Sequence, residues 1–78
     1  MDYKEFEKLV ITGHDIEFEY GSKRYSIIKA PDGYTFTEIN NKETENKYSS
    51  ILQLLINVKI NNKHLKEISQ DIKNIKIY

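Results

Sequence analysis

The chain has 78 residues, with 12 basic and 12 acidic side chains and no cysteine. A chain of this length supports one hydrophobic core, and the lack of cysteine excludes disulfide bonds and thiolate metal sites. Zero net charge argues against generic DNA binding, because domains that bind DNA are usually strongly basic. We therefore expect a single domain over residues 1–78, located in a reducing compartment such as the cytoplasm.

The first predicted element is a helix that starts after Asp2. Glu5 follows Asp2 by three positions, as in a capping box. The apolar residues that follow share one helical face: Tyr3, Phe6, Leu9 and Val10. Gly13 is expected to end the helix.

A β-hairpin is predicted over residues 16–27, because apolar and polar residues alternate on both sides of Gly21-Ser22. A two-residue turn sets three cross-strand pairs: Ile16 with Ile27, Phe18 with Tyr25, and Glu19 with Arg24. The hairpin therefore has one apolar face and one polar face.

A third strand is expected from about Tyr34 to Asn40, after a turn formed by Ala30-Pro31-Asp32-Gly33. If Phe36 points into the core, so does Glu38, which requires a bulge or a place for Glu38 at the rim of the core. Residues 40–46 are polar and show no period, so we interpret them as a loop.

The C-terminal part is predicted to contain two helices and a strand. The first of these helices begins near Lys47, and its candidate N-caps are Ser49, Thr44 and Asn46. Its apolar residues at helical spacing are Tyr48, Ile51, Leu52, Leu55 and Ile56. After a turn at Asn61-Asn62, a short helix is expected to carry Leu65, Ile68 and Ile72 and to stop at Asn74. Residues 75–78 alternate again, which favours a strand beside the hairpin.

The predicted fold class is α+β, with element order αβββααβ. Its small antiparallel sheet consists of the hairpin, the third strand and the C-terminal strand, and helices cover one face. The predicted core comprises Phe6, Leu9, Ile16, Phe18, Tyr25, Ile27, Phe36, Leu52, Leu55, Leu65, Ile68, Ile72 and Ile77.

The residue pattern indicates no catalytic residue, metal site or cofactor, so we expect that the protein is not an enzyme. His14 and His64 stand far apart in the sequence, and neither has the spacing of a metal ligand pair. Glu17 and Glu19 lie about 7 Å apart on one strand face, within the range of glycosidase carboxylates but equally typical of an exposed strand. The aromatic residues of the hairpin could stack on bases, but the alternation places them in the core.

Charge is unevenly distributed along the chain. Residues 1–46 carry ten acids and six bases, whereas residues 47–78 carry two acids and six bases. The outer face of the sheet is predicted to present Glu17, Glu19, Arg24, Ser26, Ile28, Thr35, Thr37 and Ile39. We predict that a partner protein, such as a nucleic-acid-processing host complex with a basic channel, binds at Asp15, Glu17, Glu19, Arg24 and Ile28. An acidic face attracts a basic partner, and exposed isoleucine marks contact surfaces.

No membrane attachment is expected from the sequence. The longest apolar run, residues 51–56, is far shorter than the roughly 20 residues that span a bilayer. The acidic first residues are unlike a signal peptide.

Three motifs carry a resemblance: Ile16-Glu17-Phe18-x-Tyr20-x-x-Lys23-x-Tyr25-Ser26-Ile27, Ile60-x-x-Lys63-x-Leu65-Lys66-Glu67-Ile68-x-x-Asp71-Ile72, and Ile75-x-Ile77-Tyr78. Together they resemble a set of short uncharacterised proteins from low-GC Gram-positive bacteria and their phages. Those proteins usually have Asp-Gly in place of Asn61-Asn62 and an aromatic residue in place of Ser69. The resemblance implies a fold and a genomic setting but no assigned activity. Since small phage proteins often act by occluding a host machine, it suggests an inhibitor of a bacterial defence system, of the anti-CRISPR kind.

Two functions remain open from the sequence. The first is a non-catalytic protein–protein interaction module, such as a phage or mobile-element inhibitor that acts by occlusion. The alternative is a small nucleic-acid-binding regulator that uses the Lys-rich C-terminal third. The alternative requires five lysines to form one surface patch: Lys59, Lys63, Lys66, Lys73 and Lys76.

Overall fold

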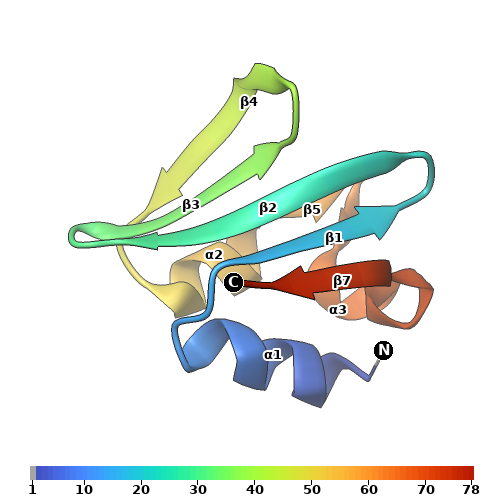
Figure 1. The fold of residues 1–78 in the computed structure, drawn as a ribbon, viewed down its shortest axis with the longest axis horizontal. Helices are drawn as coiled ribbons and strands as arrows, with labels where there is room; N and C mark the ends of the chain where they lie inside the picture. Colours follow the sequence, from blue (N-terminus) through green and yellow to red (C-terminus); the bar gives the residue numbers. More distant parts are fainter. Residues whose placement is uncertain (1) are drawn as a thin grey trace.

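A computed structural model describes residues 2–78 and shows an α+β fold with a five-stranded antiparallel sheet and three helices (Figure 1). The elements in chain order are α1 (Tyr3–Ile11), β1 (Ile16–Tyr20), β2 (Lys23–Ala30), β3 (Gly33–Glu38), β4 (Asn41–Tyr48), α2 (Ile51–Asn57), β5 (Lys59–Ile60), β6 (Lys63–His64), α3 (Leu65–Ile68), the 3₁₀ turn η1 (Ser69–Asp71) and β7 (Lys73–Ile77). The strand order is β4-β3-β2-β1-β7, and β5 and β6 form a separate hairpin.

The predicted hairpin register is confirmed. The strands β1 and β2 are antiparallel and form all three expected pairs: Ile16 with Ile27, Phe18 with Tyr25, and Glu19 with Arg24. The C-terminal strand is confirmed beside β1, although it begins at Lys73 rather than at residue 75. The sheet therefore joins the first strand of the chain to the last.

The predicted loop over residues 40–46 is wrong, because residues 41–46 belong to β4 at the edge of the sheet and only Asn40 lies in a turn. Asn40 adopts a left-handed conformation, with φ of 70°, in the turn that reverses the chain after β3. Most side chains of β4 are exposed, so the strand shows no apolar alternation that would reveal it. Its charged residues are typical of edge strands that avoid pairing with other chains.

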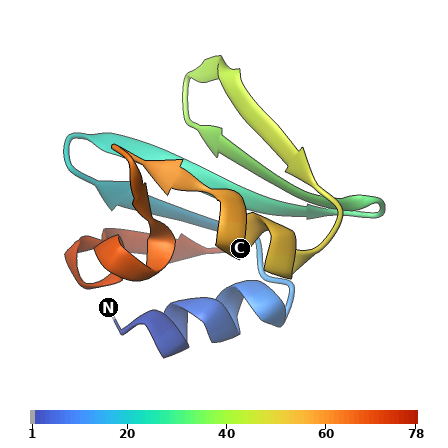
Figure 2. The ribbon, with the colours of Figure 1, turned by 180° about the vertical axis from the view of Figure 1, so that it is seen from behind.

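With β4 and the hairpin of β5 and β6 included, the predicted order αβββααβ is corrected to αββββαββαβ. The helices and this second hairpin lie on one side of the sheet and leave the other face open in residues 2–78 (Figure 2). The covered face of the sheet thus lies under the hairpin of β5 and β6 as well as under the helices. The turn between β3 and β4 stands clear of the helices in Figure 1.

The second helix begins later than predicted, at Ile51. The residues before it complete β4, and Ser50 is the N-cap, with its hydroxyl oxygen accepting a hydrogen bond of 3.2 Å from the Gln53 backbone N–H. The buried residues of α2 are Leu54 and Leu55. Leu52, which the prediction placed in the core, is exposed.

The other two helices agree with the predictions in position and differ at their ends. Asp2 is the N-cap of α1, but among the described residues its side chain accepts no hydrogen bond from the helix. Gly13, with φ of 87°, follows the last turn, and its N–H bonds the Val10 carbonyl oxygen. The third helix ends at Ile68, well before the predicted stop at Asn74, which lies within β7.

The buried side chains form one cluster between the sheet and its cover. It comprises Phe6, Val10, Ile16, Phe18, Tyr25, Ile27, Phe36, Leu54, Leu55, Val58, Ile60, Leu65, Ile68 and Ile72. Leu9 is only partly buried and Ile77 is exposed, which corrects the predicted core at these positions. Ile77 lies in an edge strand, where burial is incomplete although its cross-strand partner Ile16 is fully buried.

The structure shows both features that were expected for an inward-pointing Glu38, a bulge and a place at the rim of the core. The register of β3 and β4 shifts between Phe36 and Glu38, which indicates a bulge. The Glu38 carboxylate lies at the rim of the core, 3.5 Å from the ammonium group of Lys23. The Glu38 side chain is 19% exposed, and its charge is therefore balanced at the end of the apolar face by the ammonium group of Lys23.

The turn between β5 and β6 contains two asparagines in the left-handed region, Asn61 with φ of 53° and Asn62 with φ of 64°. Glycine adopts this conformation without the Cβ strain that asparagine retains. We expect Asn62→Gly to raise the free energy of unfolding by about 0.5 kcal/mol and the melting temperature by roughly 2–4 °C. Thermal denaturation checks this, with Asn62→Ala as the destabilised control. A lower melting temperature for Asn62→Gly would contradict the turn geometry.

Candidate functional site

The face of the sheet that the helices leave open is here called the outer face. Along β1 and β2 it carries the side chains that alternate with the buried ones: Glu17, Glu19, Arg24, Ser26 and Ile28. Four of the five predicted partner-binding residues therefore share this face. The fifth, Asp15, immediately precedes β1.

Arg24 lies between the two glutamates of β1. Its guanidinium nitrogens are 3.7 Å from Oε1 of Glu17 and 3.9 Å from Oε1 of Glu19. Arg24 also donates a hydrogen bond of 3.1 Å to the Asn74 carbonyl oxygen, and the Asn74 amide donates to Glu19 Oε1 at 3.1 Å. Arg24 therefore offsets part of the negative charge of the two glutamates, and the outer face is of mixed charge rather than acidic.

Asp15 has a structural role at the start of β1. Its Oδ1 accepts a hydrogen bond of 2.9 Å from the Lys29 backbone N–H, and its carbonyl oxygen accepts one of 2.8 Å from the Tyr78 N–H. These contacts hold β2 and the end of the chain against β1. The Asp15 carboxylate therefore has a role within the fold, and its role in partner binding stays a prediction.

A shallow depression of about 240 Å³ lies on the outer face where β1, β2 and the C-terminal residue meet. Its lining residues are Asp15, Ile16, Glu17, Ser26, Ile28 and Tyr78. Ile28 is 45% exposed and Tyr78 is 67% exposed, whereas the smaller Ser26 of β2 is nearly buried. The depression brings together three predicted residues, Asp15, Glu17 and Ile28.

Sequence reasoning did not select Tyr78 for this surface. Loss of water around its hydroxyl group, together with the negative charge of Glu17, raises the pKa of Tyr78 above its ordinary value. The signal that could have found it is the alternation of residues 75–78, which places Lys76 and Tyr78 on the same strand face. Tyr78 supplies an aromatic group to the depression that Ile28 also lines, and such groups are enriched in protein interfaces.

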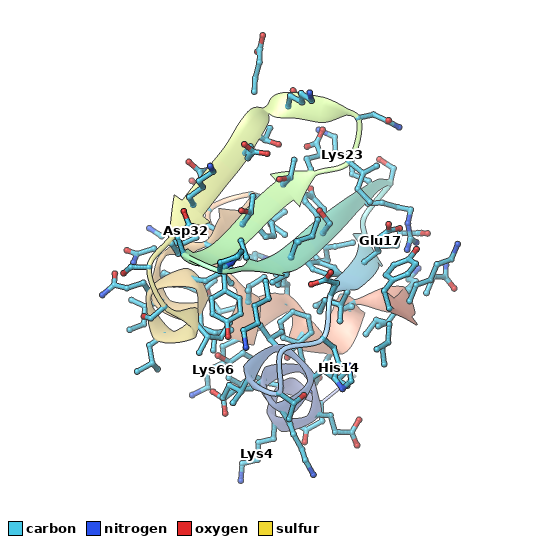
Figure 3. All side chains as sticks on the ribbon, turned by 60° about the vertical axis from the view of Figure 1, so that its left-hand side comes forward. Lys4, His14, Glu17, Lys23, Asp32 and Lys66 are labelled. Carbon is cyan, nitrogen blue, oxygen red and sulfur yellow. The ribbon has the colours of Figure 1, made fainter. Side chains whose placement is uncertain are left out.

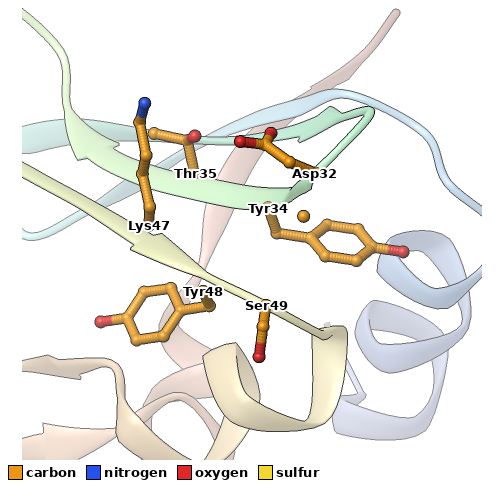
Figure 4. Close-up of a pocket in the computed structure, with 7 residues that line it drawn as sticks. Asp32, Tyr34, Thr35, Lys47, Tyr48 and Ser49 are labelled. Atoms are coloured by element: carbon orange, nitrogen blue, oxygen red, sulfur yellow. The ribbon is translucent and has the colours of Figure 1, made fainter.

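The outer face continues from Ile28 onto the next two strands. Ile28 pairs with Thr35, and Thr35 pairs with Lys47. Figure 4 shows Thr35 and Lys47 on one side of β3 and β4, with the rings of Tyr34 and Tyr48 on the other side. The centre of the face thus consists of isoleucine and threonine, and charged residues lie around it.

The five lysines of the C-terminal third are distributed over separate elements: Lys59 on β5, Lys63 on β6, Lys66 on α3, and Lys73 and Lys76 on β7. Lys73 pairs with Glu19 and Lys76 pairs with Glu17, so two of the five lie beside acidic residues. Figure 3 shows Lys66 and Glu17 projecting from different parts of the molecule. This placement disfavours one continuous basic patch.

The remaining candidates for chemistry are engaged or isolated. His14 is exposed and lies near Glu5 and Lys8 beside α1, while His64 precedes α3, where its backbone N–H donates a 2.7 Å hydrogen bond to Glu67 Oε2. Within residues 2–78, no group of three or more His, Cys, Asp or Glu side chains is placed to hold a metal ion. No helix of the described chain is long and apolar enough to cross a membrane.

The fold and the outer face define a small α+β protein with an open sheet surface of mixed polarity. The chain matches no protein-family model, no curated protein and no solved structure. Its function therefore has to be argued from this geometry.

Proposed function

We propose that the protein is a non-catalytic protein–protein interaction module whose partner binds the outer face of the sheet. The observation that carries the proposal is the exposure of Ile28 and Tyr78, which line the same depression on an open sheet face. Interfaces commonly have an apolar or aromatic centre that a partner desolvates and a polar rim that stays wet. Ile28 and Tyr78 provide the centre, and Glu17, Arg24 and Lys47 provide the rim.

The charged residues of the rim are better suited to orienting a bound partner than to attracting it over a long distance. Glu17 and Glu19 are bound to Arg24, which reduces the field that an isolated acidic pair would create. Partly buried charges in fixed positions discriminate between partners, because a like charge placed opposite them is costly. The proposed partner therefore presents an apolar side chain for the depression and charges complementary to the rim.

A narrower proposal is that the partner is a component of a bacterial defence system, which the protein inhibits by occlusion. Support for it comes from the resemblance to short phage and bacterial proteins and from the small size of the chain. The absence of cysteine suits the reducing cytoplasm, where such a partner would act. The distribution of the lysines favours a protein partner over the alternative of a nucleic acid.

The proposal predicts a specific loss of binding for Ile28→Arg. Arginine at this position introduces a charge into the centre of the interface while remaining solvated in the free protein. We expect recovery of the partner from a bacterial host lysate to fall at least about tenfold, as for a residue at an interface hot spot. Quantitative mass spectrometry of the captured proteins measures the change.

The matched control is Ile11→Arg, because Ile11 is a similarly exposed isoleucine at the end of α1. A partner retained by Ile11→Arg and lost by Ile28→Arg supports the outer face. Equal recovery by the two variants would place the interface elsewhere.

A further inference from the structure

The longest stretch without charge lies around α2, on the side of the molecule opposite the outer face (Figure 2). Residues 48–58 contain no charged side chain, although 31% of the chain is charged. A helix on a protein surface normally presents charged or polar residues to water. The uncharged surface around α2 therefore differs from an ordinary solvent-exposed helix surface.

The exposed side of α2 is uncharged and carries two large apolar residues beside the polar pair Gln53 and Asn57. Leu52 is 64% exposed and Ile56 is 60% exposed, and the two lie one turn apart on the same side of the helix. The core contacts of the helix are made by Leu54 and Leu55, which are buried. Burial in the monomer therefore does not account for Leu52 and Ile56.

A shallow, open groove lies beside the ridge formed by Leu52 and Ile56, between α1, α2 and α3. Its volume is about 370 Å³, and it is lined by Tyr3, Leu55, Ile56, His64, Lys66 and Glu67. Ile56 thus forms one wall of the groove, and Leu52 protrudes one turn towards the N-terminus of the helix. The ridge and the groove are adjacent on one surface.

We propose that a second copy of this chain covers this surface. A two-fold axis near α2 places Leu52 of each copy in the groove of the other, because the protruding residue and the groove belong to the same face. The absence of charge over residues 48–58 removes like-charge repulsion at the centre of such an interface. The rim adds one positive and one negative side chain, Lys66 and Glu67, so opposite charges can face each other across the axis.

The net charge of the whole chain also favours self-association. It is zero at pH 7, so two copies approach without long-range repulsion. The helix is short, with seven residues, and the contact is therefore at the low end of interface sizes. We expect a reversible dimer with a dissociation constant on the order of 10–100 μM.

Sedimentation equilibrium of the purified chain tests the proposal. The average mass is expected to rise from 9.3 kDa towards twice that value as the concentration increases through the expected dissociation constant. Leu52→Glu and Ile56→Glu, both at exposed positions, should keep the fold and remain monomeric over the same range. Ile28→Arg should dimerise like the parent chain, since Ile28 lies on the outer face.

A chain that stays at 9.3 kDa up to about tenfold above the expected dissociation constant would overturn the proposal. Persistence of the dimer in Leu52→Glu and Ile56→Glu would also overturn it.

Cysteine cross-linking tests the two-fold arrangement separately, because the natural chain contains no cysteine. A mixture of Leu52→Cys and Ile56→Cys chains should form disulfide-linked mixed dimers faster than either variant forms dimers alone. Equal rates for mixed and like pairs would contradict insertion of Leu52 beside the partner's Ile56. Failure of either experiment leaves the outer-face proposal unaffected, because the two surfaces share no residue.

Discussion

Phe18→Ala is expected to lower the free energy of unfolding by about 3–5 kcal/mol, which is enough to unfold much of so small a protein. Phe18 is fully buried at the centre of the sheet. Its ring packs edge-on against Phe6 of α1, with centroids 5.5 Å apart, and stacks on Tyr25 of β2 at 5.6 Å. Truncation removes the contact that joins α1 to the first hairpin and leaves a cavity.

Urea denaturation followed by circular dichroism measures the effect of Phe18→Ala. Ile11→Ala is the matched control, because it removes an apolar side chain that is half exposed, and we expect a change within about 0.5–1 kcal/mol. A Phe18→Ala variant as stable as Ile11→Ala would show that Phe18 is not a central core residue.

Gly33→Ala is expected to be similarly damaging, with a loss of about 3 kcal/mol or more. Gly33 begins β3 with φ of 144°, a conformation that alanine rarely adopts. A Cβ atom at this position would also collide with the backbone carbonyl oxygen of Tyr48, at the end of β4. Because that oxygen belongs to the backbone, relief of the collision requires β3 and β4 to separate.

Gly21→Ala is the control that separates the collision from backbone strain. Gly21 also has a positive φ, of 66°, but a Cβ atom there would meet nothing within 4 Å. We expect Gly21→Ala to cost about 1–2 kcal/mol, the price of the left-handed conformation alone. Thermal denaturation of both variants compares the two costs, and equal melting temperatures would contradict close packing of Gly33 against β4.

The sequence predicts the first hairpin well because each strand has one buried face. The apolar residues of the alternating pattern, Ile16, Phe18, Tyr25 and Ile27, are therefore the buried ones. Prediction from apolar alternation fails for β4, because this edge strand has mostly exposed side chains and no alternating pattern. It also misplaces the buried side of α2, because Leu52 and Leu54 both belong to a nearly continuous apolar run.

The candidate site is predictable where it depends on strand alternation alone. Glu17, Glu19, Arg24 and Ile28 lie on the outer face as expected. The contacts of Asn74 and Tyr78 with this face depend on the pairing of β7 with β1, across more than fifty residues of sequence. Local patterns do not determine such contacts, and for that reason the sequence did not predict the Asn74 contacts of Arg24 and Glu19 or the place of Tyr78 in the depression.

Photo-cross-linking from the outer face tests the proposed interaction module most directly. A photoreactive amino acid is placed at Ile28 in one variant and at Ile11 in another, and each is irradiated in a bacterial host lysate. We predict one discrete adduct with a host protein from position 28 and none of that mass from position 11. The same adducts from both positions, or an adduct from position 11 alone, would contradict binding through the outer face.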